Sequence, residues 1–340
     1  MKIYTTAPCE DARDARRVFP ELERIGYDGG FSFEAKHDPF LVLAVAAEHT
    51  ERIRLGTAIA IAFARNPMTL ANIGYDLQVL SAGRFILGLG SQVRPHIENR
   101  FSSTWSKPAR RMRELVLAIR TIWDTWEGRG SLRFEGEFYR HTLMTPAFDP
   151  GPNPYGPPKI FTAGVMPRMT EVAGEVADGF FVHPFNTRKS LEELTLPALR
   201  RGLEKAGRRR EDFEVVGVTM VVTGDTEAEI EALKLPVKKQ LAFYGSTPAY
   251  RPVLDCHGWG DLHPELNRLS KAGCWDEMAG LISDEILETI TVVGLRNEIA
   301  TALRRRLDGI VDSVSLTNNR VPDPTHWADI VAHFRRLGRC

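Results

Sequence analysis

The apolar positions of this chain fall into short runs separated by longer segments of helical pattern. Eight of these runs carry apolar side chains on both faces, which is typical of strands in a parallel sheet that helices cover. The predicted strands are residues 2–6, 29–34, 53–61, 85–90, 159–163, 179–183, 213–222 and 312–317.

Helical pattern fills the intervals between the strands. The predicted helices are 11–25, 40–51, 67–81, 108–127, 167–177, 188–206, 226–243, 295–307 and 325–337. Asn66 and Pro67, for example, supply an N-cap and a proline at the first helical position. Eight strands alternating with helices predict one α/β domain over 1–340, a (β/α)8 TIM barrel, with a doubly wound sheet as the alternative.

Two segments interrupt the repeat. Residues 128–158 contain a hairpin predicted to turn through Glu135 and Gly136, followed by a stretch rich in proline and glycine. Residues 244–288 have the pattern of several short helices. Insertions that follow barrel strands lie over the carboxyl-terminal face, where active sites form, so we predict that both segments are lids.

Composition and charge exclude several classes of protein. The 44 basic residues balance the 44 acidic ones, so no net field draws the protein to nucleic acid or to a membrane surface. No apolar stretch approaches the roughly 18 residues of a membrane span, and the first residues lack the pattern of a signal peptide. The four cysteines are too scattered for a disulfide framework, so we expect a cytoplasmic protein.

Two specific ligand motifs are also excluded by spacing. The segment from Gly88 to Gly90 is not a dinucleotide fingerprint, because no third glycine follows and the next predicted helix begins at Pro108. Those glycines either relieve crowding inside a barrel or leave a strand end open to a flat ring. The set Cys256, His257, His263 and Cys274 matches no usual zinc spacing, so we expect no metal.

Residues 62–92 resemble the luciferase-like monooxygenase superfamily, and more narrowly its branch of oxidoreductases that use the deazaflavin coenzyme F420. The resemblance is carried by Asn-Pro opening the third helix, Ser-Ala-Gly-Arg closing it at 81–84, and the Gly-Leu-Gly strand end. Further matching segments are EAKHDPF at 34–40, PHIENRF with RMRE within 95–114, AGVMPRMTEVAGEVADGFF at 163–181 and VVGLRNEIATAL at 292–303. The resemblance therefore covers nearly the whole chain.

This resemblance implies an F420-dependent oxidoreductase that transfers a hydride between the deazaflavin and a small organic substrate, and it implies a homodimer. Near the ring it implies acidic and histidine residues after the second strand, where this chain has Glu34 and His37. Histidine exchanges a proton near neutral pH, which suits His37 to donate one. The alternative is that His37 caps the helix that follows.

The resemblance also implies a set of coenzyme-binding residues. They are Ala58 and Ile59, joined by a non-proline cis peptide bond in the third strand; Gly90, Ser91 and Gln92, at the ring's edge; and Ala163, Gly164, Val165 and Met166, whose backbone amides would hold a phosphate beside the Arg168 cation. An ordinary trans strand and an ordinary strand–helix turn are the alternatives.

For the substrate pocket we expect His96, Trp105 and His183. Val93 stands where the family's sugar-phosphate dehydrogenase has a glutamate, which argues against glucose 6-phosphate as substrate. Lys36, Arg65, Arg94 and Arg168 are candidates to hold the polyglutamate tail of F420. The alternatives are FMN in the same barrel, as a monooxygenase or a reductase, a barrel enzyme without redox chemistry, and a binding protein without a cofactor.

Overall fold

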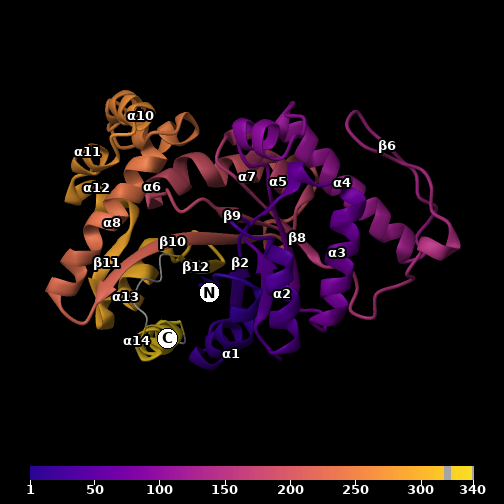
Figure 1. Cartoon of the computed structure of the whole chain (residues 1–340), viewed down its shortest axis with the longest axis horizontal. Coiled ribbons are helices and arrows are strands. Elements are labelled where there is room, and N and C mark those ends of the chain that lie inside the picture. Colours follow the sequence, from indigo (N-terminus) through magenta and orange to yellow (C-terminus); the bar gives the residue numbers. More distant parts are fainter. Residues whose placement is uncertain (318–322, 339–340) are drawn as a thin grey trace. The chain divides into compact units, whose positions relative to one another are not determined.

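A computed structural model describes residues 1–317 and 323–338. In this part of the chain, the strands of a ten-stranded sheet alternate with helices (Figure 1), in the (β/α)8 barrel fold that the sequence predicts; two short strands are present in addition to the eight of the barrel repeat. The chain forms two compact units, which we describe separately. The N-terminal unit comprises Thr6–Phe181 with Ala198–Val215, and the C-terminal unit comprises Met1–Thr5, Val182–Pro197 and Val216–Cys340.

The strands of the N-terminal unit lie in the order β2, β3, β5, β8, β9. Their bounds are β2 Gly29–Ser32, β3 Arg54–Thr57, β4 Ala60–Ile61, β5 Phe85–Gly90, β8 Lys159–Gly164 and β9 Gly179–Val182, with β4 pairing to β5. The printed registers are parallel, with Gly56 opposite Ile86 and Gly88 opposite Phe161. All of these strands therefore end at the same edge of the sheet.

Helices cover the outer side of these strands (Figure 1). They are α1 Ala15–Ile25, α2 Pro39–Glu48, α3 Pro67–Leu80, α4 Pro108–Trp126, α5 Pro167–Val176 and α7 Leu196–Lys205. Asn66 caps α3 by accepting the Thr69 N–H at 2.9 Å, as its sequence predicts. The core includes the rings of Phe31, Phe161 and Phe181, whose centroids are 5.1 and 5.3 Å apart around Phe181.

The C-terminal unit contains strands in the order β11, β10, β12, β1. Their bounds are β1 Lys2–Thr6, β10 Glu214–Gly224, β11 Val292–Leu295 and β12 Ser313–Thr317. β10 pairs with β12 through Val216–Met220 and with β11 through Val221–Gly224. The helices of this unit are α6 Arg188–Ser190, α8 Glu227–Gly245, α9 Arg251–Asp255, α10 Leu262–Ala272, α11 Trp275–Gly280, α12 Asp284–Ile290, α13 Arg296–Leu307 and α14 Pro324–Leu337.

Some predicted boundaries differ from the structure. The strand predicted over 53–61 is interrupted between β3 and β4, where the Ala58–Ile59 peptide bond is cis. Residues 292–295 form β11, which is absent from the predicted strands. The hairpin of β6 Phe134–Glu135 and β7 Arg140–His141 turns through residues 136–139 instead of a tight turn at Glu135 and Gly136.

The insertion at 128–158 connects α4 to β8, so it follows a helix and not a strand as the lid prediction assumed. Its hairpin loop nevertheless lies beside the first half of α4. Glu114 accepts the backbone N–H groups of Glu137, Phe138 and Tyr139 at 2.6–2.9 Å. Because α4 begins after the carboxyl end of β5, the hairpin loop is carried toward that end.

The insertion at 244–288 adds a second apolar cluster to the C-terminal unit. Phe185, which follows β9, is 2% exposed and packs in this cluster with Leu254, Leu266 and Ile286. The short helices of this insertion therefore lie beyond the carboxyl end of β9 within this unit. That either insertion closes over a ligand stays a prediction.

Candidate active site

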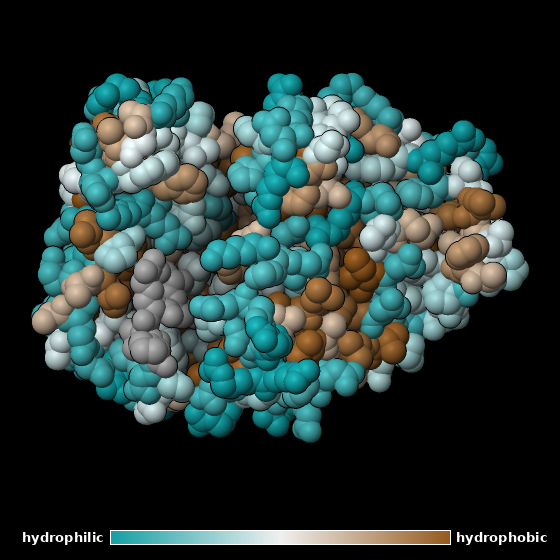
Figure 2. Space-filling view, in the orientation of Figure 1, coloured by the Kyte–Doolittle hydropathy of each residue, from teal (hydrophilic) through white to brown (hydrophobic). Residues whose placement is uncertain are grey.

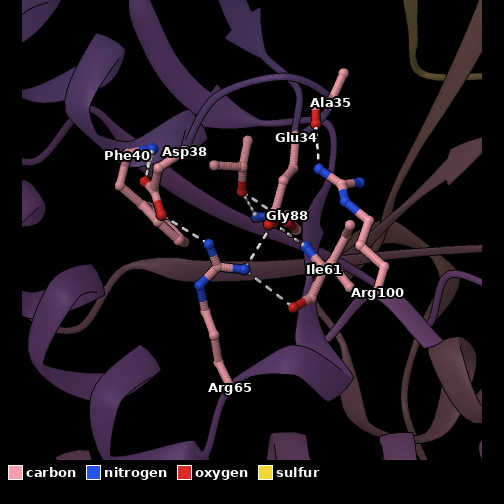
Figure 3. A network of polar contacts seen from close by, with 9 residues as sticks. Glu34, Ala35, Asp38, Phe40, Ile61, Arg65, Gly88 and Arg100 are labelled. Atoms are coloured by element: carbon pink, nitrogen blue, oxygen red, sulfur yellow. Dashed lines mark hydrogen bonds and ion pairs between the residues drawn. The ribbon is translucent and has the colours of Figure 1, made fainter. Parts of the chain in front are cut away.

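The loop between β2 and α2 is held by a partly buried arginine, Arg65 (Figure 3). Glu34 Oε2 accepts hydrogen bonds from Arg65 Nη1 at 2.6 Å and from the Ile61 N–H at 2.7 Å. The side chains of Glu34 and Arg65 are 7% and 14% exposed. Burial would lower the pKa of Arg65, but its hydrogen bonds and charge contacts with Glu34 and Asp38 outweigh burial and raise that pKa.

His37 and Glu34 have different surroundings. His37 is exposed and lines a surface depression of about 370 Å³ together with Asp11, Arg13 and the first turn of α2. Asp38, and not His37, caps α2, because its carboxylate accepts the Phe40 N–H at 2.9 Å. The alternative in which His37 is the helix cap is therefore wrong.

The Ala58–Ile59 peptide bond is cis, which confirms the prediction of a cis bond at this place. Neighbouring backbone holds both residues: the Ala58 N–H donates to Ser32 O at 2.7 Å, and the Glu34 N–H donates to Ile59 O at 3.0 Å. The segment that follows β3 is thereby tied to the end of β2.

The glycines of β5 make room for this segment. A Cβ on Gly88 would lie 1.7 Å from Thr57 O, and a Cβ on Gly90 would lie 2.7 Å from the Ile59 side chain. The Thr57 hydroxyl donates to Gly88 O at 2.6 Å and accepts the Gly88 N–H at 2.9 Å. The glycines thus relieve crowding between strands, the first of the two interpretations; contact with a ring stays a prediction.

The polar side chains after β5 turn toward their own backbone. Gln92 has a positive φ of 59°, and its side-chain oxygen accepts the Val93 N–H at 2.9 Å. The Ser91 hydroxyl donates to Gln92 O at 3.1 Å. These bonds fix the turn out of the strand, so any contact to a ligand would have to compete with them.

The turn from β8 into α5 has the form expected of an anion site. Ala163 and Gly164 end β8, Val165 and Met166 form the turn, and the N-cap Met166 makes no side-chain capping bond. A Cβ on Gly164 would lie 2.4 Å from Met169 Cγ, so any larger residue would displace the Met169 side chain. Arg168 is exposed in the first turn of α5. The helix end can therefore offer amides and a cation to an anion.

Exposed apolar side chains follow three of these neighbouring strands. Phe33 after β2, Val93 after β5 and Met166 after β8 are 51%, 42% and 48% exposed. Ala58 and Ile59, after β3, are partly exposed. Phe33 is not among the site residues that the sequence predicts, because an apolar residue that ends a strand has the same pattern whether it faces the core or the solvent.

The residues expected to contact substrate are placed in different surroundings. His96 is exposed at the start of a helical turn over His96–Arg100. Trp105 packs edge-on against Phe63, with ring centroids 5.7 Å apart, and Arg111 lies over the same Phe63 ring. Trp105 is thus part of an aromatic and cationic cluster that also supports the loop after β5.

His183 belongs to the C-terminal unit, at the end of β9. Its Nδ1 accepts the Phe185 N–H at 3.1 Å, and its ring stacks on Tyr250 with centroids 4.3 Å apart. Tyr244 packs edge-on to it at 4.7 Å. Burial lowers the pKa of His183 to about 3, so its imidazole is neutral at physiological pH and carries its proton on Nε2.

Two of the four basic residues expected to hold the coenzyme tail form ion pairs with carboxylates of the protein. Arg65 is paired with Glu34 and Asp38, and Arg94 is paired with Glu98 at 2.9 Å. Lys36 and Arg168 are exposed. Within residues 1–317 and 323–338, no group of three or more His, Cys, Asp or Glu side chains could hold a metal ion. None of the described helices is both long and apolar enough to cross a membrane.

Comparison with known proteins gives two informative sequence relatives. An uncharacterized protein of Mycobacterium tuberculosis is 59% identical over 314 residues, which cover 92% of each chain. A putative coenzyme F420-dependent oxidoreductase of the same species is 29% identical over 289 residues, 80% of this chain and 81% of the relative.

Solved structures share the fold. The coenzyme F420-dependent tetrahydromethanopterin reductase of Methanopyrus kandleri superposes with a TM-score of 0.78 and 18% identity over 97% of each chain. The oxygenating constituent of 3,6-diketocamphane monooxygenase of Pseudomonas putida, in complex with FMN, gives a TM-score of 0.67 and 17% identity, again over 97% of each chain. The family model for luciferase-like monooxygenases matches residues 2–313. The chain therefore belongs to the luciferase-like monooxygenase family, in which the relatives with functional names include F420-dependent oxidoreductases.

Proposed function

We propose that the protein is a coenzyme F420-dependent oxidoreductase that transfers a hydride between the deazaflavin and a small organic substrate. The observation that carries the proposal is the edge formed by the carboxyl ends of β2, β3, β5 and β8. There, exposed apolar side chains occur together with a helix N-terminus that has no side-chain cap. The name of the M. tuberculosis relative supports the same coenzyme.

The residues present at this edge fit the two chemical parts of such a coenzyme. Phe33, Val93, Met166 and the Ala58–Ile59 segment offer apolar surface to a flat ring. The amides at the start of α5, with Arg168, suit a phosphate. When bound, the deazaflavin would supply the hydride chemistry, and the protein would supply position and a proton.

Individual residues take the following roles in this proposal. His37, exposed in the loop after β2, donates the proton that balances hydride transfer. His96 and Trp105 contact the substrate. Gly90, Ser91 and Gln92 lie at the edge of the ring.

The test is a titration of the purified protein with F420 and, separately, with FMN, followed by fluorescence. We expect micromolar or tighter binding of F420, about −8 kcal/mol, and much weaker binding of FMN. FMN binding alone would replace deazaflavin chemistry by flavin chemistry on the same fold. Binding of neither would contradict the proposal and point to a barrel enzyme without redox chemistry or to a binding protein.

FMN is a second candidate because of the charges at the site. Two of the four cations expected to hold the F420 tail, Arg65 and Arg94, are neutralised by carboxylates. FMN has no such tail, and its single phosphate needs only the α5 N-terminus and Arg168. The paired titrations decide between the two coenzymes.

The homodimer is also a proposal, and α2 supports it. Residues 39–47 of this helix, PFLVLAVAA, are all apolar, yet Leu41 is 63% exposed among the residues that the structure describes. Val79 and Leu80 of α3 are exposed as well, and apolar residues gather over the region of α2 and α3 (Figure 2). A helix that is apolar on every face is usually buried, which a second copy of the chain would achieve.

A further inference from the structure

We infer that Arg65 is a positioning residue, whose side chain links the two ends of the loop that carries His37. Glu34 is then the partner of Arg65 and not a proton donor. The inference deepens the proposed function and rests on it for the role of His37. It starts from a single guanidinium group that bonds to both ends of one short loop.

Glu34 and Asp38 are four residues apart and flank Ala35, Lys36 and His37. Arg65 Nη1 donates to Glu34 at 2.6 Å, and Arg65 Nη2 donates to Asp38 at 2.7 Å (Figure 3). Asp38 in turn caps α2. The loop is thereby closed by one side chain that comes from the following strand–helix connection, outside the loop itself.

The same arginine also reaches the segment that follows the cis peptide bond. Arg65 Nη1 donates to Ile61 O at 3.1 Å, while Glu34 Oε2 accepts the Ile61 N–H at 2.7 Å. The loop after β2 and the segment after β3 are therefore fixed by one set of bonds. Displacing Arg65 would release the proton donor and the proposed ring support together.

A second arginine holds the middle of the loop. Arg100, from the turn after β5, donates to Ala35 O at 2.6 Å (Figure 3). The loop is thus bonded at Glu34, at Ala35 and at Asp38, and His37 is carried between the last two. This arrangement restricts where the imidazole can lie, although the imidazole itself is exposed.

The chemistry of the guanidinium group explains why the residue that links the two loop ends is an arginine. A guanidinium group is planar, always charged, and presents several N–H donors in fixed directions, whereas a lysine offers one point charge. Glu34 Oε2 accepts two N–H groups, one from Arg65 and one from Ile61. Because this oxygen is engaged with the protein, we assign Glu34 to positioning and leave proton donation to His37.

The test compares Arg65→Gln and Arg65→Lys with a matched control, Arg24→Gln. Arg24 forms a two-point pair with Glu21 at 2.6 and 2.9 Å on the exposed face of α1, so the control breaks a similar bond pattern away from the loop. The first readout is amide hydrogen exchange of the free protein over 33–39 and 58–62. The second is affinity for F420, with thermal unfolding measured in parallel.

In Arg65→Gln we expect exchange in both segments to accelerate at least about tenfold, with exchange in 85–90 unchanged. We also expect the Kd for F420 to rise about tenfold, and Arg65→Lys to restore part of the affinity. A general structural role would lower the melting temperature and accelerate exchange everywhere, and Lys would not restore the affinity selectively.

Two results would overturn the inference: unchanged exchange in both segments, or wild-type coenzyme affinity in Arg65→Gln despite faster exchange. If the wild-type protein binds neither F420 nor FMN, but exchange over 33–39 and 58–62 is faster in Arg65→Gln, then Arg65 still links the loop ends as a property of the fold. The proposed function and the positioning role toward a coenzyme would then be rejected. The exchange data, which need no coenzyme, therefore separate the two failures.

Discussion

At the scale of single residues, the absence of one Cβ atom decides how closely β3 approaches β5. Gly88 faces Thr57 O, a backbone atom that can move only if the strand moves. Gly90 faces the Ile59 side chain, whose outer atoms can rotate away. The two glycines of one motif are therefore required to different degrees.

We expect Gly88→Ala to reduce the free energy of unfolding by about 3 kcal/mol, because the added methyl overlaps the β3 backbone. Gly90→Ala should cost about 1 kcal/mol, since a rotamer change of Ile59 relieves the contact. Urea unfolding of both variants and the wild type measures the difference. Equal costs for the two variants would contradict the packing that we describe.

We expect the free energy of unfolding to depend on pH through His183. Its native pKa of about 3 lies below the value of about 6.5 expected in the unfolded chain, so the unfolded state binds more protons between these pH values. Stability from this group is therefore complete above pH 6.5 and falls as the pH drops from 6.5 toward 3. The slope from one group is at most about 1.4 kcal/mol per pH unit.

The check is the free energy of unfolding against pH for the wild type and for His183→Asn. Asparagine has no titrating group and can still accept the Phe185 N–H. We expect the variant's curve to be flatter between pH 6.5 and 4. Parallel curves for the two proteins would show that His183 is protonated in the native state as readily as in the unfolded one.

At the scale of elements, the turn from β8 into α5 concentrates the features of an anion site in a few residues. Pro167 occupies the first helical position, and the N-cap Met166 supplies no side-chain acceptor for the first amides. Helix amides that lack a partner in the chain favour an anionic ligand. The function of this element therefore depends on charge at its first turn.

We expect Arg168→Glu to raise the Kd for the bound coenzyme about tenfold and to make binding less sensitive to salt, because a cation next to the phosphate is replaced by an anion. Arg200→Glu, an exposed residue of α7, makes the same charge change on a neighbouring helix and serves as the control. Fluorescence titration at two salt concentrations measures both effects. Equal losses in the two variants would indicate a general effect of charge, without a site at α5.

At the scale of the whole molecule, the proposed homodimer explains why Leu41 is exposed on the apolar helix α2. We expect a native mass twice the 38.1 kDa of the chain, measured by light scattering coupled to gel filtration. Leu41→Asp places a charge on the exposed face of α2 and should shift the protein toward the monomer, because a buried unpaired carboxylate is costly.

A matched control for the dimer is Leu235→Asp. Leu235 lies on α8 and is 55% exposed, but it is far in sequence from α2 and α3. It should leave the native mass unchanged. A monomeric wild-type protein, or a dimer that resists Leu41→Asp, would remove α2 from the interface.

The sequence by itself determined the order and kind of the main elements. β5 has the predicted bounds of 85–90, and the strand–helix turn at Gly164 and Met166 lies where its motif places it. These features depend on hydrophobic periodicity, helix caps and glycines, which act over a few neighbouring residues. The resemblance added the cis bond after Ala58, which periodicity cannot reveal.

Only the tertiary structure decided how the parts of the site depend on one another. Arg65 is 31 residues from Glu34 in sequence, and Arg100 is 65 residues from Ala35, so no local pattern could pair them. The exposure of Phe33 likewise depends on which strands stand beside β2. Contacts between distant residues form only when the chain packs. Because of these contacts, Glu34, which the resemblance implies as a catalytic residue, is now proposed as the partner of Arg65.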